Sequence, residues 1–291
     1  MFWQQLLNGI TLGSTYALIA LGYTMVYGIV QLINFAHGEI YMFGAAAGLF
    51  LVTVAGFSLF PAMLGAMLFC MLLGVVVEKI AYRPLRGKSS RLSALISAIG
   101  VSIFLSTLML LIAGPNTRRF PEVIDGTTFH VGSLELSSMQ ITILLVAALL
   151  MIGLQLMIQK TRLGMAMRAA SEDLDAAYLM GINVNRIISL TFAIGSALAA
   201  AGGVMVGVYY NAVFPYMGTM AGMKAFSAAV LGGIGSIPGA MLGGLMLGIL
   251  EIMGVAFISS SYKDAIAFGI LILVLIIRPQ GLLGKKISKK V

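Results

Sequence analysis

Residues 161–188 read TRLGMAMRAASEDLDAAYLMGINVNRII and form a charged segment between two long apolar stretches. At helical spacing, the apolar side chains of this segment fall near one face and the acidic ones lie one or two positions further round. The apolar face comprises Leu174, Ala177, Tyr178 and Met180 or Gly181, and the acidic residues are Glu172, Asp173 and Asp175. This pattern predicts a cytoplasmic helix that docks into a groove on a soluble partner.

The composition indicates the class of protein. Of the 291 residues, 60% are hydrophobic and 10% are charged, whereas about a quarter of the residues of a soluble domain are charged. The mean hydropathy is +1.03. We therefore expect an all-α, polytopic membrane protein in which residues 1–291 form a single transmembrane domain, with no room for a soluble catalytic domain. The net charge of +8 comes from loop clusters of Lys and Arg and does not indicate nucleic-acid binding.

A helix of about 20 apolar residues crosses the hydrocarbon layer of a bilayer. The hydropathy pattern predicts about eight or nine transmembrane segments, some of them short or broken. Their approximate ranges are 5–30, 38–57, 61–82, 92–113, 138–159, 187–210, 221–236, 238–258 and 264–281. The run 221–236 is short, but it must count as a crossing if Arg186 and Arg278 lie on the same side of the membrane.

Basic residues orient these segments, because Lys and Arg are enriched in cytoplasmic loops. Three clusters are expected in the cytoplasm: Lys79, Arg83, Arg86, Lys88 and Arg91; Lys160, Arg162, Arg168 and Arg186; and the C-terminal Arg278, Lys285, Lys286, Lys289 and Lys290. Residues 114–137, which include Asp125, are then an external loop, and residues 161–188 a cytoplasmic coupling segment. The N-terminus is expected outside, unless residues 34–39 belong to a broken or re-entrant element.

Glycine and proline interrupt one predicted span. Residues 231–244 read LGGIGSIPGAMLGG, and backbone groups freed by such a break are tolerated in a membrane only if protein or a water-filled path satisfies them. Gly232, Gly233, Gly235 and Pro238 are therefore candidate hinge or path-wall residues. Elsewhere, glycines four residues apart, such as Gly9 and Gly13 or Gly244 and Gly248, indicate closely packed helices.

Three polar residues lie beside the first two predicted spans and mark a second segment that does not fit a regular transmembrane helix. Asn34, His37 and Glu39 are costly beside apolar spans unless they face a cavity or a polar partner. One interpretation places them on a translocation path, and the other at a helix end near the membrane surface. No metal site is expected, because the chain has two His and one Cys.

Lys224 and Glu251 are ionisable residues inside predicted spans. Both fall toward the external side in this topology, so they are expected to pair across neighbouring helices, which would lower the cost of both charges.

No nucleotide site is expected, because Tyr82 stands where a phosphate-binding loop ending at Gly87-Lys88-Ser89 needs its first Gly. ATP, if used, must be hydrolysed by another chain, and no cofactor is expected in this one.

The sequence resembles known proteins both in one short motif and in several longer stretches. Asp175-Ala176-Ala177 followed by Gly181 resembles the coupling motif of ABC importer permeases, with Asp in place of Glu and without the proline that follows in the fuller motif. Longer stretches resemble the LivH-type permeases of branched-chain amino acid ABC importers: 9–45, AYRPLR from Ala81, ALISAIGVSIFL from Ala94, 168–204 and 223–244.

The resemblance implies a permease in the bacterial inner membrane with a cytoplasmic C-terminus. It implies as partners a LivM-type second permease, two cytoplasmic ATPases and a periplasmic protein that delivers leucine, isoleucine or valine. Glu172, Asp175, Ala176, Ala177 and Gly181 would then contact an ATPase, with the alanines and the glycine allowing close approach. Import of urea or a short amide, and ion-coupled secondary transport, remain as alternatives.

Overall fold

The computed structural model describes residues 1–86, 91–124, 126–132 and 134–284. Lys88, Asp125, Lys285, Lys286, Lys289 and Lys290, which entered the orientation argument, lie outside these residues. The helices are α1 (Phe2–Val30), α2 (His37–Thr53), α3 (Leu59–Val77), α4 (Arg91–Ala113), α5 (Ser138–Lys160), α6 (Arg162–Glu172), α7 (Leu174–Leu179), α8 (Val184–Tyr209), α9 (Met217–Gly232), α10 (Ile237–Phe257) and α11 (Lys263–Ile277). Short elements are the π-helical turn η1 (Glu78–Tyr82), the 3₁₀ turns η2 (Arg83–Leu85) and η3 (Ser260–Tyr262), and the strands β1 (Thr128–Val131) and β2 (Leu134–Ser137).

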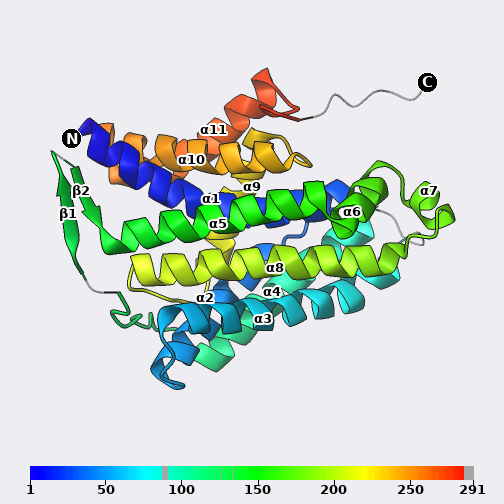
Figure 1. Ribbon diagram of the computed structural model, residues 1–291, viewed down its shortest axis with the longest axis horizontal. Helices are drawn as coiled ribbons and strands as arrows, with labels where there is room; N and C mark the ends of the chain where they lie inside the picture. Colours follow the sequence, from blue (N-terminus) through cyan, green and yellow to red (C-terminus); the bar gives the residue numbers. More distant parts are fainter. Residues whose placement is uncertain (87–90, 125, 133, 285–291) are drawn as a thin grey trace.

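The long helices lie side by side along the longest axis of the molecule (Figure 1). The β1–β2 hairpin and the N-terminus share one end, here called the hairpin end, and α6 and α7 project from the opposite, coupling end. The Gln4 side chain joins the N-terminus to the hairpin, because its Nε2 donates to the Glu135 carbonyl at 2.8 Å and its Oε1 accepts from the Glu135 N–H at 2.9 Å. The N-terminus therefore lies on the same side as the predicted external loop.

Seven helical segments of the described chain are long and apolar enough to cross a membrane. They correspond to seven of the nine expected segments. The other two, 38–57 and 221–236, correspond to α2 with 17 residues and α9 with 16. The expectation of a polytopic helical membrane protein with short helices is confirmed, and both short helices follow irregular stretches of chain, residues 31–36 and 210–216.

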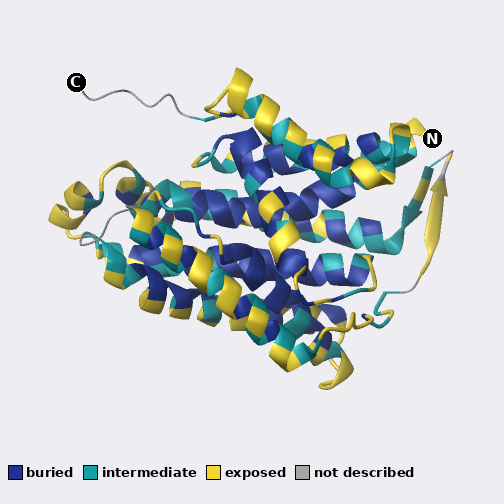
Figure 2. Ribbon diagram, turned by 180° about the vertical axis from the view of Figure 1, so that it is seen from behind, coloured by how far each residue is buried: buried dark blue, intermediate teal, exposed yellow. Residues whose placement is uncertain are grey.

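Burial divides the helices into an inner and an outer set. The membrane-length windows of α1 and α8 are 94% and 83% buried inside the protein, whereas those of α4 and α11 are 17% and 6% buried. Figure 2 shows the buried ribbon gathered in the middle of the bundle. The exposed apolar faces of the outer helices are suited to contact with lipid.

Glycines bring the backbones of α1 and α10 into contact. A Cβ on Gly13 would lie 2.7 Å from the Leu245 carbonyl oxygen, and one on Gly244 would lie 2.4 Å from the Ala17 Cα. Similar contacts join α2 to α8, where a Cβ on Gly44 would lie 2.4 Å from the Ala200 Cα. Small residues at such crossings let membrane helices approach closely.

The segment 114–137 contains the strands β1 and β2, which pair antiparallel with Thr128 opposite Ser137. One part of the expected architecture is wrong in detail. The coupling segment is not one continuous helix, because it breaks at Asp173, whose extended backbone (φ −159°) ends α6 and begins α7.

The glycine contacts generate a stability prediction. Gly244→Ala should destabilise the protein by about 1–3 kcal/mol, because its methyl group would push against the backbone of α1. Gly153→Ala is the matched control: a Cβ on Gly153 in α5 would meet no described atom within 4 Å outside its own turn of helix, so the substitution should be neutral or slightly stabilising. Thermal unfolding of the two purified variants measures the difference, and equal midpoints would contradict the packing argument.

Candidate functional site: the coupling end

The turn from α5 into α6 is fixed by short-range contacts. Thr161 caps α6, because its Oγ1 accepts from the Gly164 N–H at 3.1 Å. Gly164 packs on the end of α5, where a Cβ would lie 2.2 Å from the Ile158 carbonyl oxygen. Arg168 Nη1 donates to that same carbonyl at 2.7 Å. These contacts satisfy backbone groups that helix ends leave unpaired, so α6 is held firmly against α5.

Asp173 both separates and caps the two coupling helices. Its Oδ1 accepts from the N–H groups of Asp175 at 2.9 Å and Ala176 at 3.0 Å. An Asp at this position stabilises a helix start, because it satisfies free N–H groups and complements the helix dipole. The six-residue α7 is therefore a defined turn of helix at the tip of the molecule.

Three large apolar side chains cover the outside of this tip. Tyr178, Leu179 and Met180 are 72%, 84% and 82% exposed. Asp175 and Ala176 are also exposed, whereas Ala177 is buried against its own chain. Gly181 adopts φ +82°, and a Cβ added there would meet no other described atom within 4 Å, so the left-handed backbone is one reason for glycine at this position, and its close approach to an ATPase stays a prediction.

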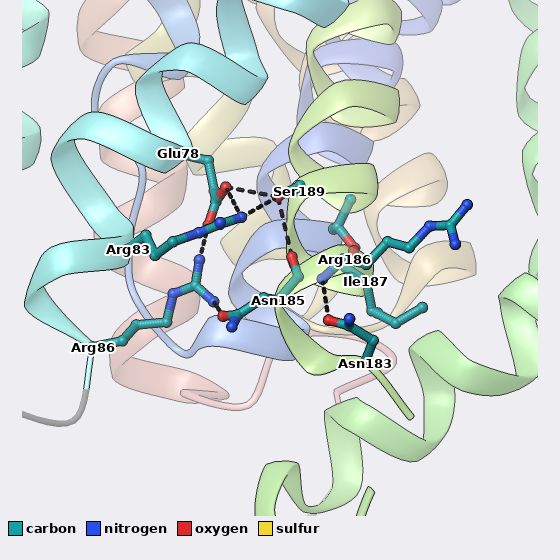
Figure 3. Close-up of polar contacts among 9 residues, drawn as sticks. Glu78, Arg83, Arg86, Asn183, Asn185, Arg186, Ile187 and Ser189 are labelled. Atoms are coloured by element: carbon teal, nitrogen blue, oxygen red, sulfur yellow. Dashed lines mark hydrogen bonds and ion pairs between the residues drawn. The ribbon is translucent and has the colours of Figure 1, made fainter. Parts of the chain in front are cut away.

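A buried carboxylate lies behind the coupling helices and was not among the sequence-predicted site residues. Glu78, in the π-helical turn after α3, is fully buried and meets two arginines (Figure 3). Arg83 Nη2 donates to Glu78 Oε2 at 3.1 Å, and Arg86 Nη2 is in direct contact with Oε1. Partial burial lowers the pKa of the Arg86 guanidinium from its usual value, but an arginine remains charged at neutral pH.

The same cluster joins α3 to the start of α8. Ser189 Oγ donates to Glu78 Oε2 at 2.7 Å and accepts from Arg83 Nη2 at 2.8 Å. Asn185 Oδ1 accepts from Arg86 Nη1 at 3.1 Å. Asn183 caps α8 through the Arg186 N–H at 3.0 Å. The first turns of the helix that follows the coupling segment are therefore bonded to the end of α3.

The break between α1 and α2 holds the first group of predicted path residues. Asn34 Oδ1 accepts from the Tyr82 hydroxyl at 2.8 Å, and His37 Nε2 lies 3.2 Å from the Ile19 carbonyl, to which its N–H form donates. Glu39, two residues further on, instead lines a cavity with Ser102 and Thr219. The three residues are all buried, but the structure does not bring them into one polar site.

The break between α9 and α10 holds the second group. Gly233 and Gly235 have φ values of +103° and +92°, and Ser236 Oγ and Pro238 begin α10. The chain near the C-terminus covers the end of α9, because the N–H groups of Leu282 and Leu283 donate to the carbonyls of Leu231 and Gly232, both at 2.9 Å. Gly235 also shares a small cavity with Arg168 of α6, so this break and the C-terminal segment lie at the coupling end.

Lys224 and Glu251 form part of a larger ion network. Lys224 Nζ lies 2.9 Å from Glu251 Oε1 and 2.7 Å from Asp264 Oδ1, and Lys263 Nζ lies 3.3 Å from the same Glu251 oxygen. The Tyr16 hydroxyl donates to that oxygen at 3.3 Å. The network links α1, α9, α10 and α11. Across the residues that the structure describes, no three His, Cys, Asp or Glu side chains are placed to hold a metal ion.

A bundle of membrane-length helices with two short inner helices and a capped helix pair at one end is the architecture of a polytopic α-helical membrane protein. The sequence model of the family described as "Branched-chain amino acid transport system / permease component" matches residues 5–275, and the chain belongs to this family. It is 49% identical to the high-affinity branched-chain amino acid transport system permease protein LivH of Escherichia coli and 50% identical to BraD of Pseudomonas aeruginosa, in each case over 100% of this chain and 98% of the relative. The solved structure of PsaBC from Streptococcus pneumoniae in complex with Fab has the same fold, with a TM-score of 0.52, 13% identity and coverage of 94% of this chain and 91% of that chain.

The Glu78 cluster generates a prediction. Glu78→Gln should lower the stability of the protein by about 2 kcal/mol or more, because it removes the charge that two buried or half-buried guanidinium groups face. The matched control is Glu135→Gln in the hairpin, whose carboxylate is 69% exposed and should change stability by about 0.5 kcal/mol or less. Thermal unfolding of purified protein makes the comparison, and an unchanged midpoint for Glu78→Gln would refute a stabilising role.

Proposed function

We propose that this chain is a transmembrane permease subunit of an ABC importer for branched-chain amino acids. The observation that carries the proposal is the apolar tip of α7, held out at the coupling end by two capped turns. An exposed apolar patch rimmed by charge is typical of a protein-binding surface, and its occupant would be a cytoplasmic ATPase. Full-length similarity to LivH and BraD supports leucine, isoleucine and valine as substrates.

The proposal places the coupling end in the cytoplasm and the hairpin end in the periplasm. Arg83, Arg86, Arg162 and Arg168 all lie at the coupling end, which supports this orientation. The residues leading to the C-terminus lie there as well. A second permease of the LivM type would complete the path across the membrane, two ATPases would bind the coupling ends, and a periplasmic protein would deliver substrate at the hairpin end.

A movement of the bound ATPase would displace α7, and two sets of contacts would transmit that displacement to the membrane helices. Movement of α6 would pull on α5 through Gly164 and Arg168, and movement of the following loop would pull on α8 and, through Glu78, on α3. The irregular segments 31–36 and 233–236 are the natural hinges, because Gly and loop residues absorb changes in backbone angle. The inner helices α2 and α9, which border these segments, would then reorient to open the path to alternate sides.

The alternative functions differ from the proposed one in the transported solute or in the need for an ATPase. A permease for urea or a short amide would keep the same ATPase contacts and differ only in the solute that uptake assays detect. An ion-coupled secondary transporter would work without α7 contacts. Uptake of labelled leucine by the reconstituted complex, with and without ATP, separates the three.

The docking surface generates a prediction. Leu179→Asp should abolish co-purification of the ATPases and reduce leucine uptake to background, because it puts a charge in the centre of an apolar contact. Phe129→Asp is the matched control: Phe129 is 53% exposed on the hairpin, so its substitution should leave ATPase binding intact. Retention of the ATPases by the Leu179 variant would refute the docking surface.

A second prediction concerns Gly181. Gly181→Val should weaken ATPase binding and uptake strongly, because a β-branched residue strains the left-handed backbone. Gly181→Asn should retain most of both, since Asn tolerates that conformation. Membrane insertion should be normal in both variants, as measured by their amounts in washed membranes. Equal behaviour of Val and Asn would show that conformation is not the reason for glycine here.

A further inference from the structure

A cavity of about 300 Å³ opens on the surface of the chain between α2, α4, α9 and α11. Its outer residues are apolar and half-exposed, among them Ile99, Ile103 and Met223 at 42%, 61% and 50%. Phe226 and Leu271, which are half-buried, also line it. This volume lies at the lower end of the range for small-molecule sites, so the cavity suits a small and largely aliphatic ligand.

The floor of the cavity carries a carboxylate that is only half satisfied. Glu39 is 1% exposed, and its Oε1 accepts hydrogen bonds from Ser102 Oγ at 3.2 Å and Thr219 Oγ1 at 3.0 Å. Its other oxygen, Oε2, is buried and has no hydrogen-bond partner among the residues that the structure describes. A buried carboxylate oxygen in this state is costly unless a donor, best of all a cation, reaches it.

Two helix starts meet beside this carboxylate. Glu39 lies in the first turn of α2, and Gly218 and Thr219 lie in the first turn of α9. The two turns touch, because a Cβ on Gly218 would lie 2.5 Å from the Gly38 carbonyl oxygen. A helix start carries about half a positive charge and N–H groups without intrahelical partners. The floor therefore offers a negative oxygen next to positive backbone dipoles.

We infer that this cavity is a binding site for the amino acid itself during its passage. The ammonium group would meet Glu39 Oε2, the carboxylate would face the first turn of α9, and the branched side chain would lie among Ile99, Phe226 and Leu271. A zwitterion matches both signs of charge at the floor, whereas a lipid acyl chain would fill the apolar part and leave the carboxylate unpaired. The inference rests on the proposed function and deepens it by naming a place on the path where the permease recognises substrate.

The first experiment measures occupancy. Ile103→Cys, in a Cys70→Ala background and in the intact complex, is alkylated with N-ethylmaleimide in the presence of leucine, 3-methylbutylamine or 4-methylpentanoate. Leucine and the amine should slow alkylation of this cysteine, the deaminated acid should not, and adding Glu39→Gln should remove the protection. Equal protection by 4-methylpentanoate, as an apolar cleft or lipid site would give, or protection by none of the three, would overturn the inference.

The second experiment measures transport. Glu39→Gln should lower leucine uptake by about tenfold or more, as expected for loss of a charge-assisted contact, while the ATPases still co-purify. Ile103→Trp should block uptake by filling the cavity, and Ile96→Trp is its matched control, on the same helix and equally exposed at 61% but outside the cavity. Normal uptake in Glu39→Gln and Ile103→Trp would refute only this site, whereas a wild-type complex that lacks ATPases or leucine uptake would refute the proposed function.

Discussion

Backbone contact between α1 and its neighbours is the constraint on which the rest of the structure depends. In lipid there is little hydrophobic drive for apolar helices to associate, so close packing must supply the attraction. Glycines at 9, 13, 244 and 248 let α1 and α10 touch along several turns. Because these contacts enclose α1, the irregular segments near it are kept away from lipid, where their unpaired backbone groups would be costly. The short helices α2 and α9 can therefore lie inside the bundle.

Three buried glutamates of the bundle differ in the groups that their carboxylates contact. Glu78 is neutralised by arginines and holds α3 to α8 at the coupling end. Glu251 is neutralised by lysines and holds the helices that include α9 and α10. Glu39 and Glu251 each keep one buried oxygen without a hydrogen-bond partner among the described residues, but Glu39 is bonded to the hydroxyl groups of Ser102 and Thr219 and has no ion pair there to a basic side chain. The first two carboxylates are paired with basic side chains, and the third is the one for which we infer a ligand.

The transmembrane spans and one buried ion pair could be predicted from the sequence, each for a physical reason. Hydropathy located the spans because a bilayer demands long apolar runs, and topology placed Lys224 and Glu251 at similar depth, where the structure brings them together. The break at Asp173 could not be predicted, because the surrounding residues suit a continuous helix and only the capping geometry distinguishes the two. The partners of Glu78 could not be predicted either: Ser189 is 111 residues away along the chain, although two Arg five and eight residues after a Glu were a local signal.

The central claim is that α7 is the contact through which ATP hydrolysis reaches the membrane helices. The most direct measurement is photo-crosslinking in intact cells, with a photoreactive amino acid at position 179 and, separately, at position 129 in the hairpin. The account predicts that the probe at 179 captures a cytoplasmic ATPase and that the probe at 129 does not. Capture of an ATPase from position 129, or no capture of one from position 179, would contradict it.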